Sequence, residues 1–483
     1  MMRTELFIGG QWREGSGPLF TSHDPATGDK VWEGREANAD DVAEAMAAAR
    51  LAFPSWSRRP LDERLAIVRA FAKAIEERAD EIARTISREM GKALWDSKGE
   101  VQAMIGKIEI SIRAQAERAG AKEEKAAFGA MTLSHHAHGV LAVFGPFNFP
   151  GHLPNGHIVP ALLAGNCVLF KPSEITPGVA ALMVEAWDGA GLPAGVLNLL
   201  QGGRDPGAAL LDSHGLNGVL FTGSAHTGAF IHKKFAGRPD VILALELGGN
   251  NPLIVWPPVD AKAAANLIVH SAFATSGQRC SCARRLIVPH GAEGDAIIAA
   301  LAELTPQISV GPATQTPEPF LGPVVNAQSA ERAVKVEQGL LAAGGKSIVP
   351  LKRDGAFVYP GIVDVSGLNP PDEELFGPLL QVYRVNDFDH ALDVANATRF
   401  GLAGGLISDD PALWVRVKNE MRAGILNWNR PTTGASGAMP FGGPGLSGSL
   451  RPSAYYAADY VAYPVATQLS EKATPIPAPG LPS

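Results

Sequence analysis

The chain has 483 residues and a formal net charge of −7, and this mild acidity argues against nucleic acid as a general partner. Its length exceeds what one hydrophobic core supports, so we expect two or three domains. No apolar run approaches the roughly 18–20 residues that a membrane span needs, and the N-terminus lacks the apolar core of a signal peptide. Three cysteines cannot form a disulfide framework, which favours a reducing cytoplasm.

Helical spacing of apolar residues predicts two long helices near the N-terminus, over residues 40–53 and 61–89. Five short apolar runs then alternate with helix-length segments, at 140–144, 168–170, 196–200, 219–221 and 241–245. Runs of this kind predict an α/β fold with a doubly wound parallel sheet. A second α/β series starts at 252–255 and 286–288 and predicts a separate domain. The proline-rich tail, 474–483, predicts an extended or disordered end.

Two motifs in the middle of the chain carry the chemistry. Residues 276–280 read Ser-Gly-Gln-Arg-Cys and place Cys280 in a Gly-rich, polar setting. Residues 245–249 read Leu-Glu-Leu-Gly-Gly and contain Glu246. A thiolate is a strong nucleophile toward carbonyl carbon, and a carboxylate beside it can take a proton from water. Together the motifs predict acyl chemistry through a covalent thioester.

A dinucleotide site is expected at the carboxyl ends of the parallel strands. The literal G-x-G-x-x-G at Gly443, Gly445 and Gly448 is a decoy, because too little chain follows it for a βαβ unit. Residues 221–228 are a better candidate, since a strand there ends in a small-residue turn before a helix whose N–H groups would hold a pyrophosphate. The alternative is a plain strand-to-helix turn. Residues 171–174, Lys-Pro-Ser-Glu, end another strand and suit ribose hydroxyls, or else form a solvated salt bridge.

Several tempting residues have simpler interpretations. Cys282 lies two residues past Cys280, but a regulatory disulfide is uncommon in the cytosol. Cys167 lies in a predicted buried strand and reads as a small hydrophobic residue. His135, His136 and His138 do not form a metal motif, because strand alternation puts only His136 and His138 on one face and no cysteine or carboxylate joins them. We therefore expect no metal.

An ordered series of motifs along nearly the whole chain resembles the aldehyde dehydrogenase superfamily. The matching segments are 24–28, 145–150, 171–174, the turn at Gly223, 246–249, 277–280, 373–378 and 440–443. Three longer segments resemble the branch of that family that oxidises N-succinylglutamate 5-semialdehyde in arginine catabolism. These are 149–157, 427–431 and 451–456.

The resemblance implies a role for each landmark residue. Cys280 would attack the aldehyde carbon, and Asn148 would donate its side-chain N–H to the oxyanion. Glu246 would activate the water that hydrolyses the thioester. NAD would be the cofactor, and its expected ligands are Lys171, Glu174, Gly223, Ser224, Ala225, His226, Thr227, Gly228, Glu374 and Phe376.

The same resemblance implies where an anionic aldehyde binds. Arginine is the side chain best suited to bind the carboxylates of such a substrate, because its guanidinium can donate two parallel hydrogen bonds to one carboxylate. A structural salt bridge is the alternative for each arginine. The expected substrate-binding residues are Arg279, Arg430, His152, Asn155 and Phe441. Arg284 and Arg285 are weaker candidates, since they lead into the next strand.

The implied architecture is the aldehyde dehydrogenase fold, a Rossmann-like NAD domain with an α/β catalytic domain and a small β oligomerisation arm. We expect the NAD-binding domain at 1–119 and 138–249 and the catalytic domain at 250–445. The arm and tail would be 120–137 and 446–483. The resemblance also implies a cytoplasmic homodimer or dimer of dimers that acts on a small-molecule aldehyde.

Three functions stay open at this point: an NAD-dependent hydrolytic dehydrogenase, a relative that passes the acyl group to coenzyme A, and a structural protein that kept the fold without catalysis. A dehydrogenase for another small anionic aldehyde is a variant of the first. Relatives that use coenzyme A generally lack a glutamate at the position of Glu246, so a free acid is the expected product.

Overall fold

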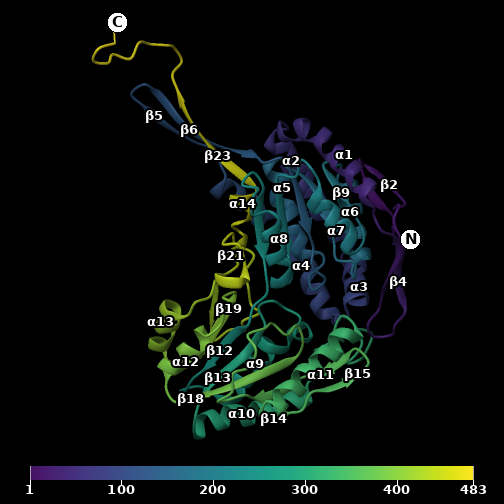
Figure 1. Ribbon diagram of the computed structural model, residues 1–483, viewed down its shortest axis with the longest axis vertical. Helices are drawn as coiled ribbons and strands as arrows, with labels where there is room; N and C mark the ends of the chain where they lie inside the picture. The colour runs from purple at the N-terminus through teal and green to yellow at the C-terminus, as the bar shows by residue number, and fades with distance from the viewer. Residues whose placement is uncertain (1, 482–483) are drawn as a thin grey trace.

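A computed structural model describes residues 2–481 (Figure 1). Its first sheet has seven strands in the order β11-β10-β7-β8-β9-β1-β2. Five strands pair in parallel: β7 (Val140–Phe144), β8 (Cys167–Lys171), β9 (Leu197–Leu199), β10 (Gly218–Thr222) and β11 (Ile242–Glu246). β1 (Leu6–Ile8) runs antiparallel to β9 and to β2 (Gln11–Arg13). The five parallel strands are the five predicted apolar runs, so the sheet prediction is confirmed.

Helices cover both faces of this sheet and leave its central strands buried. One face carries α1 (Ala39–Ser57) and α7 (Arg204–Asp212), and the other carries α5 (His152–Ala164) and α6 (Pro177–Gly189). An outer layer of three helices packs on α5 and α6: α2 (Leu61–Glu77), α3 (Ala79–Met90) and α4 (Leu94–Arg118). The helix α8 (Ala225–Lys234) follows β10.

The N-terminal helices differ from the prediction in two ways. The single helix expected over 61–89 is two helices, because Arg78 leaves the helical conformation at φ −112°, ψ 18°. Its guanidinium there donates 2.6 Å to Glu185 of α6. The long helix α4 was not predicted, because its buried face includes Glu100 and Lys107, which conceal its apolar period.

The second body is another seven-stranded sheet, in the order β14-β17-β18-β13-β12-β19-β20. All neighbouring pairs are parallel except β14 with β17. The predicted runs at 252–255 and 286–288 lie in β12 and β13, which confirms the second series. The strands are β12 (Asn251–Val255), β13 (Ala283–Pro289), β14 (Lys346–Val349), β17 (Gly361–Asp364), β18 (Leu379–Val385), β19 (Ala403–Ile407) and β20 (Ile425–Trp428).

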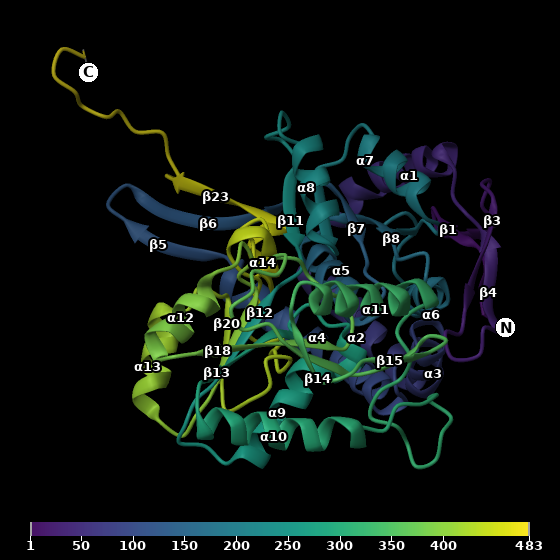
Figure 2. The same cartoon turned by 60° about the horizontal axis from the view of Figure 1, so that its bottom comes forward.

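Five helices accompany the second sheet, and Figure 2 shows α9 and α10 along one side of it. They are α9 (Ala261–Phe273), α10 (Ala292–Leu304), α11 (Ala327–Ala342), α12 (Phe388–Asn396) and α13 (Pro411–Glu420). Short antiparallel pairs complete this body and the N-terminal edge: β3 (Leu19–His23) with β4 (Lys30–Arg35), β15 (Lys352–Asp354) with β16 (Phe357–Tyr359), and β21 (Pro440–Phe441) with β22 (Ser453–Ala454).

A three-stranded antiparallel arm projects from the two bodies (Figure 1). It consists of β5 (Lys122–Ala126), β6 (Gly129–Ala137) and β23 (Ala462–Leu469), with β6 in the middle. The short helix α14 (Ala457–Tyr460) precedes β23 and packs into the core of the first body. Beyond β23, residues 474–481 have neither helix nor strand; the last two residues of the predicted tail lie outside the described residues. None of the helices within 2–481 has the length and apolarity to cross a membrane.

Candidate active site

Cys280 lies where the carboxyl edge of the first sheet meets the start of β12 and β13. The 3-10 turn Ala274–Gly277 precedes it, with Thr275 and Ser276 at φ 57° and 55°. Gly277 follows at φ 71°, and a Cβ there would overlap the backbone of Gly377, so only glycine fits this turn. The side chain of Asn251, at the start of β12, donates 2.7 Å to the Cys280 carbonyl oxygen. These contacts hold the cysteine loop against the second sheet.

Asn148 reaches the same loop from the first sheet. It follows β7, is 4% exposed, and its Nδ2 donates 3.0 Å to the Gln278 carbonyl oxygen across 130 residues of sequence. A side-chain amide has two N–H groups, so the second remains for an oxyanion at Cys280. The structure therefore places Asn148 against the loop that carries Cys280, and its role as the oxyanion donor stays a prediction.

Glu246 is the last residue of β11 and is buried at 4% exposure. Its Oε1 accepts a hydrogen bond of 3.2 Å from the Ser453 N–H, while Oε2 has no hydrogen-bond partner among the described residues. Burial raises the pKa of Glu246 well above its usual range, and the bond from Ser453 opposes this. A carboxylate with a raised pKa is a stronger base, which suits it to accept a proton.

The Cys280 thiol lies within electrostatic reach of two carboxylates. Burial raises the pKa of Cys280, and the negative charges of Glu374 and Glu246 raise it further, while Arg284 opposes them. The sulfur is therefore a neutral thiol in this state, and its attack on a carbonyl needs a base. The raised carboxyl of Glu246 is such a base.

The turn predicted to hold a pyrophosphate lies between β10 and α8, next to Glu246. The Gly223 N–H donates 3.0 Å to the Glu246 carbonyl oxygen. Ser224 caps α8, since its Oγ accepts 3.2 Å from the Thr227 N–H. A Cβ at Gly228 would overlap Leu247, so the helix needs glycine to approach this closely. Ala225 and His226 complete the first turn of α8.

Lys171 and Glu174 lie at the carboxyl end of β8, on the same edge of the sheet. Lys171 is buried, and its Nζ donates 2.7 Å to the Pro172 carbonyl oxygen. Glu174 lies 3.9 Å from that ammonium and keeps 56% of its side chain exposed. The carboxylate is therefore open to a ligand, while the ammonium is mostly enclosed.

Glu374 and Phe376 enter the site from the loop before β18. Glu374 Oε1 accepts 3.2 Å from the Gly249 N–H, and a Cβ at Gly248 would collide with its other carboxylate oxygen. Burial raises the pKa of Glu374 to about 7, and Arg284 opposes this. The Phe376 ring lies edge-on to Phe147, with centroids 5.8 Å apart. This loop therefore touches the turn that follows Glu246.

The predicted substrate residues divide into three groups. Arg279 is committed to an ion pair, since its guanidinium lies 2.8 Å from Asp96 and donates 2.7 Å to Thr275 Oγ1, so the salt-bridge alternative holds for it. Arg430 is exposed and forms no ion pair with any other described residue.

His152 and Asn155 lie in the first turns of α5, with Asn155 fully buried. Phe441 lies in β21 and its carbonyl oxygen accepts from Ser453 Oγ at 3.3 Å, which places it beside Glu246.

The sequence reasoning missed two residues that organise the loops. Ser453 lies in a segment noted only for its resemblance, and its bond to Glu246 spans 207 residues. Arg284 was ranked low, yet its guanidinium donates to the carbonyl oxygens of Gly277 at 2.7 Å and Gly377 at 3.2 Å. It joins the cysteine loop to the Glu374 loop. The sequence did contain a signal for Arg284, because a basic residue inside a predicted buried strand needs polar partners within the protein.

Two other motifs have structural roles, and one of them lies next to Glu246, since the Leu247 N–H donates 2.9 Å to the Ser447 carbonyl oxygen of the G-x-G-x-x-G segment. The G-x-G-x-x-G segment forms a loop with a 3-10 turn at Gly445–Ser447 and no βαβ unit, as expected. His136 and His138 both pack near the ring of Tyr463, at centroid distances of 5.7 and 5.6 Å. Within the described chain, no three His, Cys, Asp or Glu side chains are placed to hold a metal ion.

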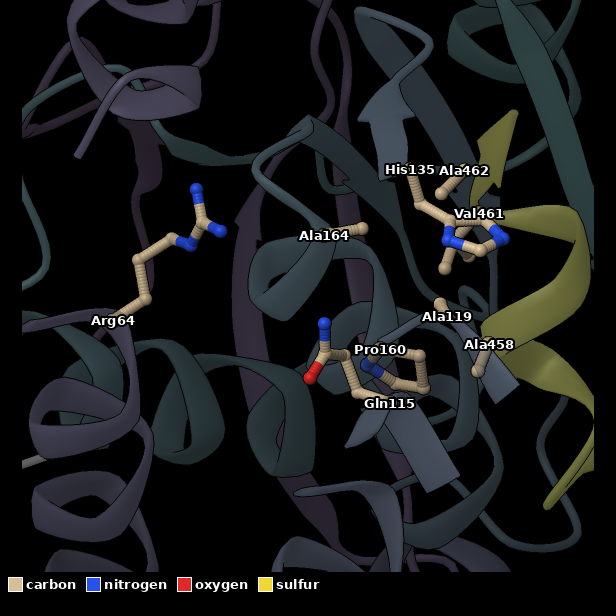
Figure 3. Close-up of a pocket in the computed structure, with 9 residues that line it drawn as sticks. All are labelled: Arg64, Gln115, Ala119, His135, Pro160, Ala164, Ala458, Val461 and Ala462. Atoms are coloured by element: carbon tan, nitrogen blue, oxygen red, sulfur yellow. The ribbon is translucent and has the colours of Figure 1, made fainter. Parts of the chain in front are cut away.

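A small cavity at the base of the arm is separate from this site (Figure 3). Its volume is about 30 Å³, room for an ordered water and not for a substrate. Its lining residues are Arg64, Gln115, Ala119, His135, Pro160, Ala164, Ala458, Val461 and Ala462.

A thiol, a buried carboxylate and an amide donor lie between two parallel-sheet bodies, an arrangement suited to an α/β enzyme of covalent acyl chemistry. The comparison with family models gives the same class: the aldehyde dehydrogenase family matches residues 12–463. The chain belongs to the aldehyde dehydrogenase family and is an oxidoreductase, so the fold and enzyme class expected from its motifs are confirmed.

Curated relatives and solved structures agree with this assignment. An N-succinylglutamate 5-semialdehyde dehydrogenase of Paraburkholderia xenovorans is 54% identical, and one of Caulobacter vibrioides is 58% identical, each over 96% of both chains. A methylmalonate-semialdehyde dehydrogenase from Oceanimonas doudoroffii superposes with a TM-score of 0.92 at 27% identity over 98% of this chain and 99% of that one. PnpE, solved with nicotinamide adenine dinucleotide, gives 0.91 at 28% identity over 99% of each chain.

Proposed function

We propose that this protein oxidises N-succinyl-L-glutamate 5-semialdehyde to N-succinyl-L-glutamate with NAD⁺, a reaction of arginine degradation. The observation that carries the proposal is the 54% and 58% identity, over 96% of both chains, to the two relatives named for this substrate. The geometry of Cys280, Asn148 and Glu246 supports the reaction type.

The chain's own residues would share the work as follows. Cys280 Sγ adds to the aldehyde carbon while Glu246 accepts the thiol proton, and the resulting oxyanion of the thiohemiacetal is bound by the free N–H of Asn148. NAD⁺, when bound, supplies the hydride acceptor. Glu246 then releases that proton to solvent, takes a proton from the water that attacks the thioester, and returns it to the departing thiolate, which frees the acid and restores the thiol.

The residues at the carboxyl edge of the first sheet fit a dinucleotide. Glu174, with 56% of its side chain exposed, is a free acceptor for ribose hydroxyls. The N-terminus of α8 offers N–H groups to a pyrophosphate beside the Gly223 turn. Glu374 is an acceptor for a second ribose, near enough to Cys280 to raise its pKa. We propose these residues, with Lys171 and Phe376, as the NAD site and residues 1–119 and 138–249 as the domain that contains it.

A direct assay tests the proposal. The purified protein is given NAD⁺ with N-succinylglutamate semialdehyde or with propanal, each with and without coenzyme A, and NADH is followed. We expect a higher kcat/KM for the succinylated substrate, a free acid product, and no effect of coenzyme A. A preference for propanal would overturn the substrate, and an acyl-coenzyme A product would overturn the hydrolytic step. Cys280→Ser is the matched inactive control.

We also propose a cytoplasmic homo-oligomer assembled through the arm, with residues 120–137 and 446–483 as the segments that supply it. The arm carries exposed apolar side chains, including Phe128 at 48%, Met131 at 41% and Leu469 at 46% exposure, and exposed apolar side chains of this kind are suited to contact another copy. Light scattering of the full chain should give a mass of two or four protomers. A single protomer mass would contradict the assembly.

A further inference from the structure

Four polar side chains between α4 and α5, three of them buried and His152 half-buried, have atoms with no hydrogen-bond partner among the described residues. Lys107 and Ser111 lie on α4, and His152 and Asn155 lie on α5. Within the described residues, Lys107 Nζ, Ser111 Oγ, His152 Nδ1 and both polar atoms of the Asn155 side chain have no hydrogen-bond partner. Lys107 is 2% exposed, Ser111 1% and Asn155 0%. Unpaired polar groups buried this deeply are costly, so a cluster of them calls for a ligand.

Two contacts fix how α4 faces α5. Glu100 Oε1 accepts from the N–H groups of Gly151 at 2.9 Å and His152 at 3.1 Å, so its face of α4 points to the start of α5. Lys107 and Ser111 follow Glu100 at helical spacing on that face. Burial lowers the pKa of both His152 and His157, and the positive charge of Lys107 lowers it further, so the ammonium lies within electrostatic reach of the first turns of α5.

A second buried lysine on the same side of the molecule shows what Lys107 lacks. Lys92 is equally enclosed, and its Nζ lies 2.7 Å from the Glu100 carboxylate. Lys107 has no carboxylate within ion-pair distance among residues 2–481, and burial lowers its pKa to about 8. A buried ammonium is stabilised by an anion with further hydrogen bonds. Glu100 of the chain is that anion for Lys92, whereas the anion beside Lys107 would have to come from a bound ligand.

The surroundings offer room and a connection to the reacting atoms. Gly156 follows Asn155 in α5, and a Cβ there would meet no atom within 4 Å. His157 donates or accepts at 2.8 Å with the Tyr460 hydroxyl and at 3.2 Å with Thr222 Oγ1, and Thr222 pairs with Glu246 across β10 and β11. These contacts connect α5, which carries Asn155, to the strand that lies beside Glu246.

We propose that Lys107 and Asn155, with Ser111 and His152 beside them, form the subsite that binds a carboxylate of the substrate. This inference rests on the proposed function, because it concerns the anionic part of the same aldehyde. The ammonium, the amide N–H and the hydroxyl all donate, which matches a carboxylate with several lone pairs. Arg279 is excluded from this role by its ion pair with Asp96. Arg430, at the surface, is left for the second carboxylate.

The test compares Lys107→Met, Asn155→Leu and the exposed control Lys98→Met on the same helix. The measured quantity is the ratio of kcat/KM for N-succinylglutamate semialdehyde to that for pentanal, a neutral five-carbon aldehyde. We expect Lys107→Met to lower this ratio about 10- to 100-fold, mainly through KM, and Asn155→Leu to lower it about 10-fold. Lys98→Met should leave the ratio at the wild-type value. Calorimetric binding of the product N-succinylglutamate should weaken in parallel without any turnover.

The outcomes separate the two proposals. A wild-type enzyme that prefers pentanal overturns the proposed function and this subsite with it. A wild-type preference for the succinylated substrate that survives in Lys107→Met and Asn155→Leu overturns the subsite alone. If Lys107→Met does not fold, Lys107→Gln and Ser111→Ala replace it, and an unchanged ratio with unchanged product binding in those variants counts against the subsite in the same way.

Discussion

The backbone N–H of Ser453 holds one oxygen of the Glu246 carboxylate at 3.2 Å, and the other oxygen has no partner in the described part of the chain. The hydrogen bond fixes the orientation of the carboxylate but leaves its second oxygen without a hydrogen bond from any described residue. The free oxygen can therefore accept a proton, from the thiol or from water. A Cβ on Gly442 would approach the held oxygen to 3.1 Å, so the segment beside it has been kept small.

The first prediction concerns this carboxylate. Glu246→Gln should keep the hydrogen bond from Ser453 but lose the base that activates water, so hydrolysis of the thioester becomes the slow step. Steady-state turnover should fall about 100-fold or more, and mass spectrometry after addition of substrate and NAD⁺ should show an acyl adduct on the protein. Normal turnover would exclude Glu246 as the base. Loss of the first burst of NADH as well would show that Glu246 is also required to activate Cys280.

The second prediction separates the two neighbouring cysteines. Cys280→Ala should lower NADH formation by about 1,000-fold or more, because it removes the nucleophile. Cys282→Ala should keep most activity, since Cys282 is fully buried and its sulfur contacts the Ala274 carbonyl oxygen at 3.7 Å. Activity assays with matched melting curves check both variants. An active Cys280→Ala beside an inactive Cys282→Ala would reverse the assignment.

Much of the fold follows from local sequence, while the connections of the site do not. The strands of the first sheet are buried on both faces, so they appear as continuous apolar runs, and the glycines of the loops mark the turns around Cys280 and Glu246. The helix α4 escaped prediction because Glu100 and Lys107 face inward, where their pairing or lack of it depends on α5.

The same limit applies to single side chains of the site. Arg279 is hydrogen-bonded to Asp96 across 183 residues of sequence, and Ser453 to Glu246 across 207. No local pattern in the sequence marks such pairs, because both partners are ordinary residues of their own segments. At the break between α2 and α3, the Arg78 side chain likewise donates to Glu185, which belongs to another helix.

The third prediction concerns cofactor preference. Glu174 is the accessible carboxylate at the end of β8, and a 2′-phosphate placed there would meet a like charge. We expect a higher kcat/KM with NAD⁺ than with NADP⁺, and a smaller ratio in Glu174→Ser. Lys171 lies 3.9 Å away and softens the preference, so NADP⁺ should retain some activity. The exposed Glu77→Gln is the control; equal efficiency with both cofactors in the wild type would contradict the argument.

The fourth prediction distinguishes the two arginines. Arg279→Ala leaves the Asp96 carboxylate, 6% exposed in its side chain, without its guanidinium partner at 2.8 Å. It should destabilise the protein by about 3 kcal/mol and reduce activity on anionic and neutral aldehydes alike. Arg430→Ala should melt like the wild type and raise KM only for the succinylated substrate. Melting curves and kinetics on both aldehydes check this, and a selective KM effect in Arg279→Ala would return that residue to the substrate site.

The last prediction follows from the buried carboxyl of Glu374. Its pKa is raised from 4.5 to about 7 by burial, so the folded protein holds this proton to a higher pH than the unfolded chain does. As pH rises from about 4.5 to 7, the unfolded state ionises first, and the free energy of unfolding falls; above pH 7 this contribution is flat. Glu374→Gln cannot ionise and its side-chain oxygen still accepts from the Gly249 N–H.

The variant should therefore be more stable than the wild type by about 3 kcal/mol at pH 8, and the difference should shrink to below about 1 kcal/mol at pH 5. Denaturant unfolding at both pH values, at equal ionic strength, measures it. Glu373→Gln is the matched control, because Glu373 is the exposed neighbour in the same loop and its replacement should give the same small effect at both values. A stability difference that does not change between pH 5 and pH 8 would show that the Glu374 carboxyl titrates alike in the folded and unfolded chains.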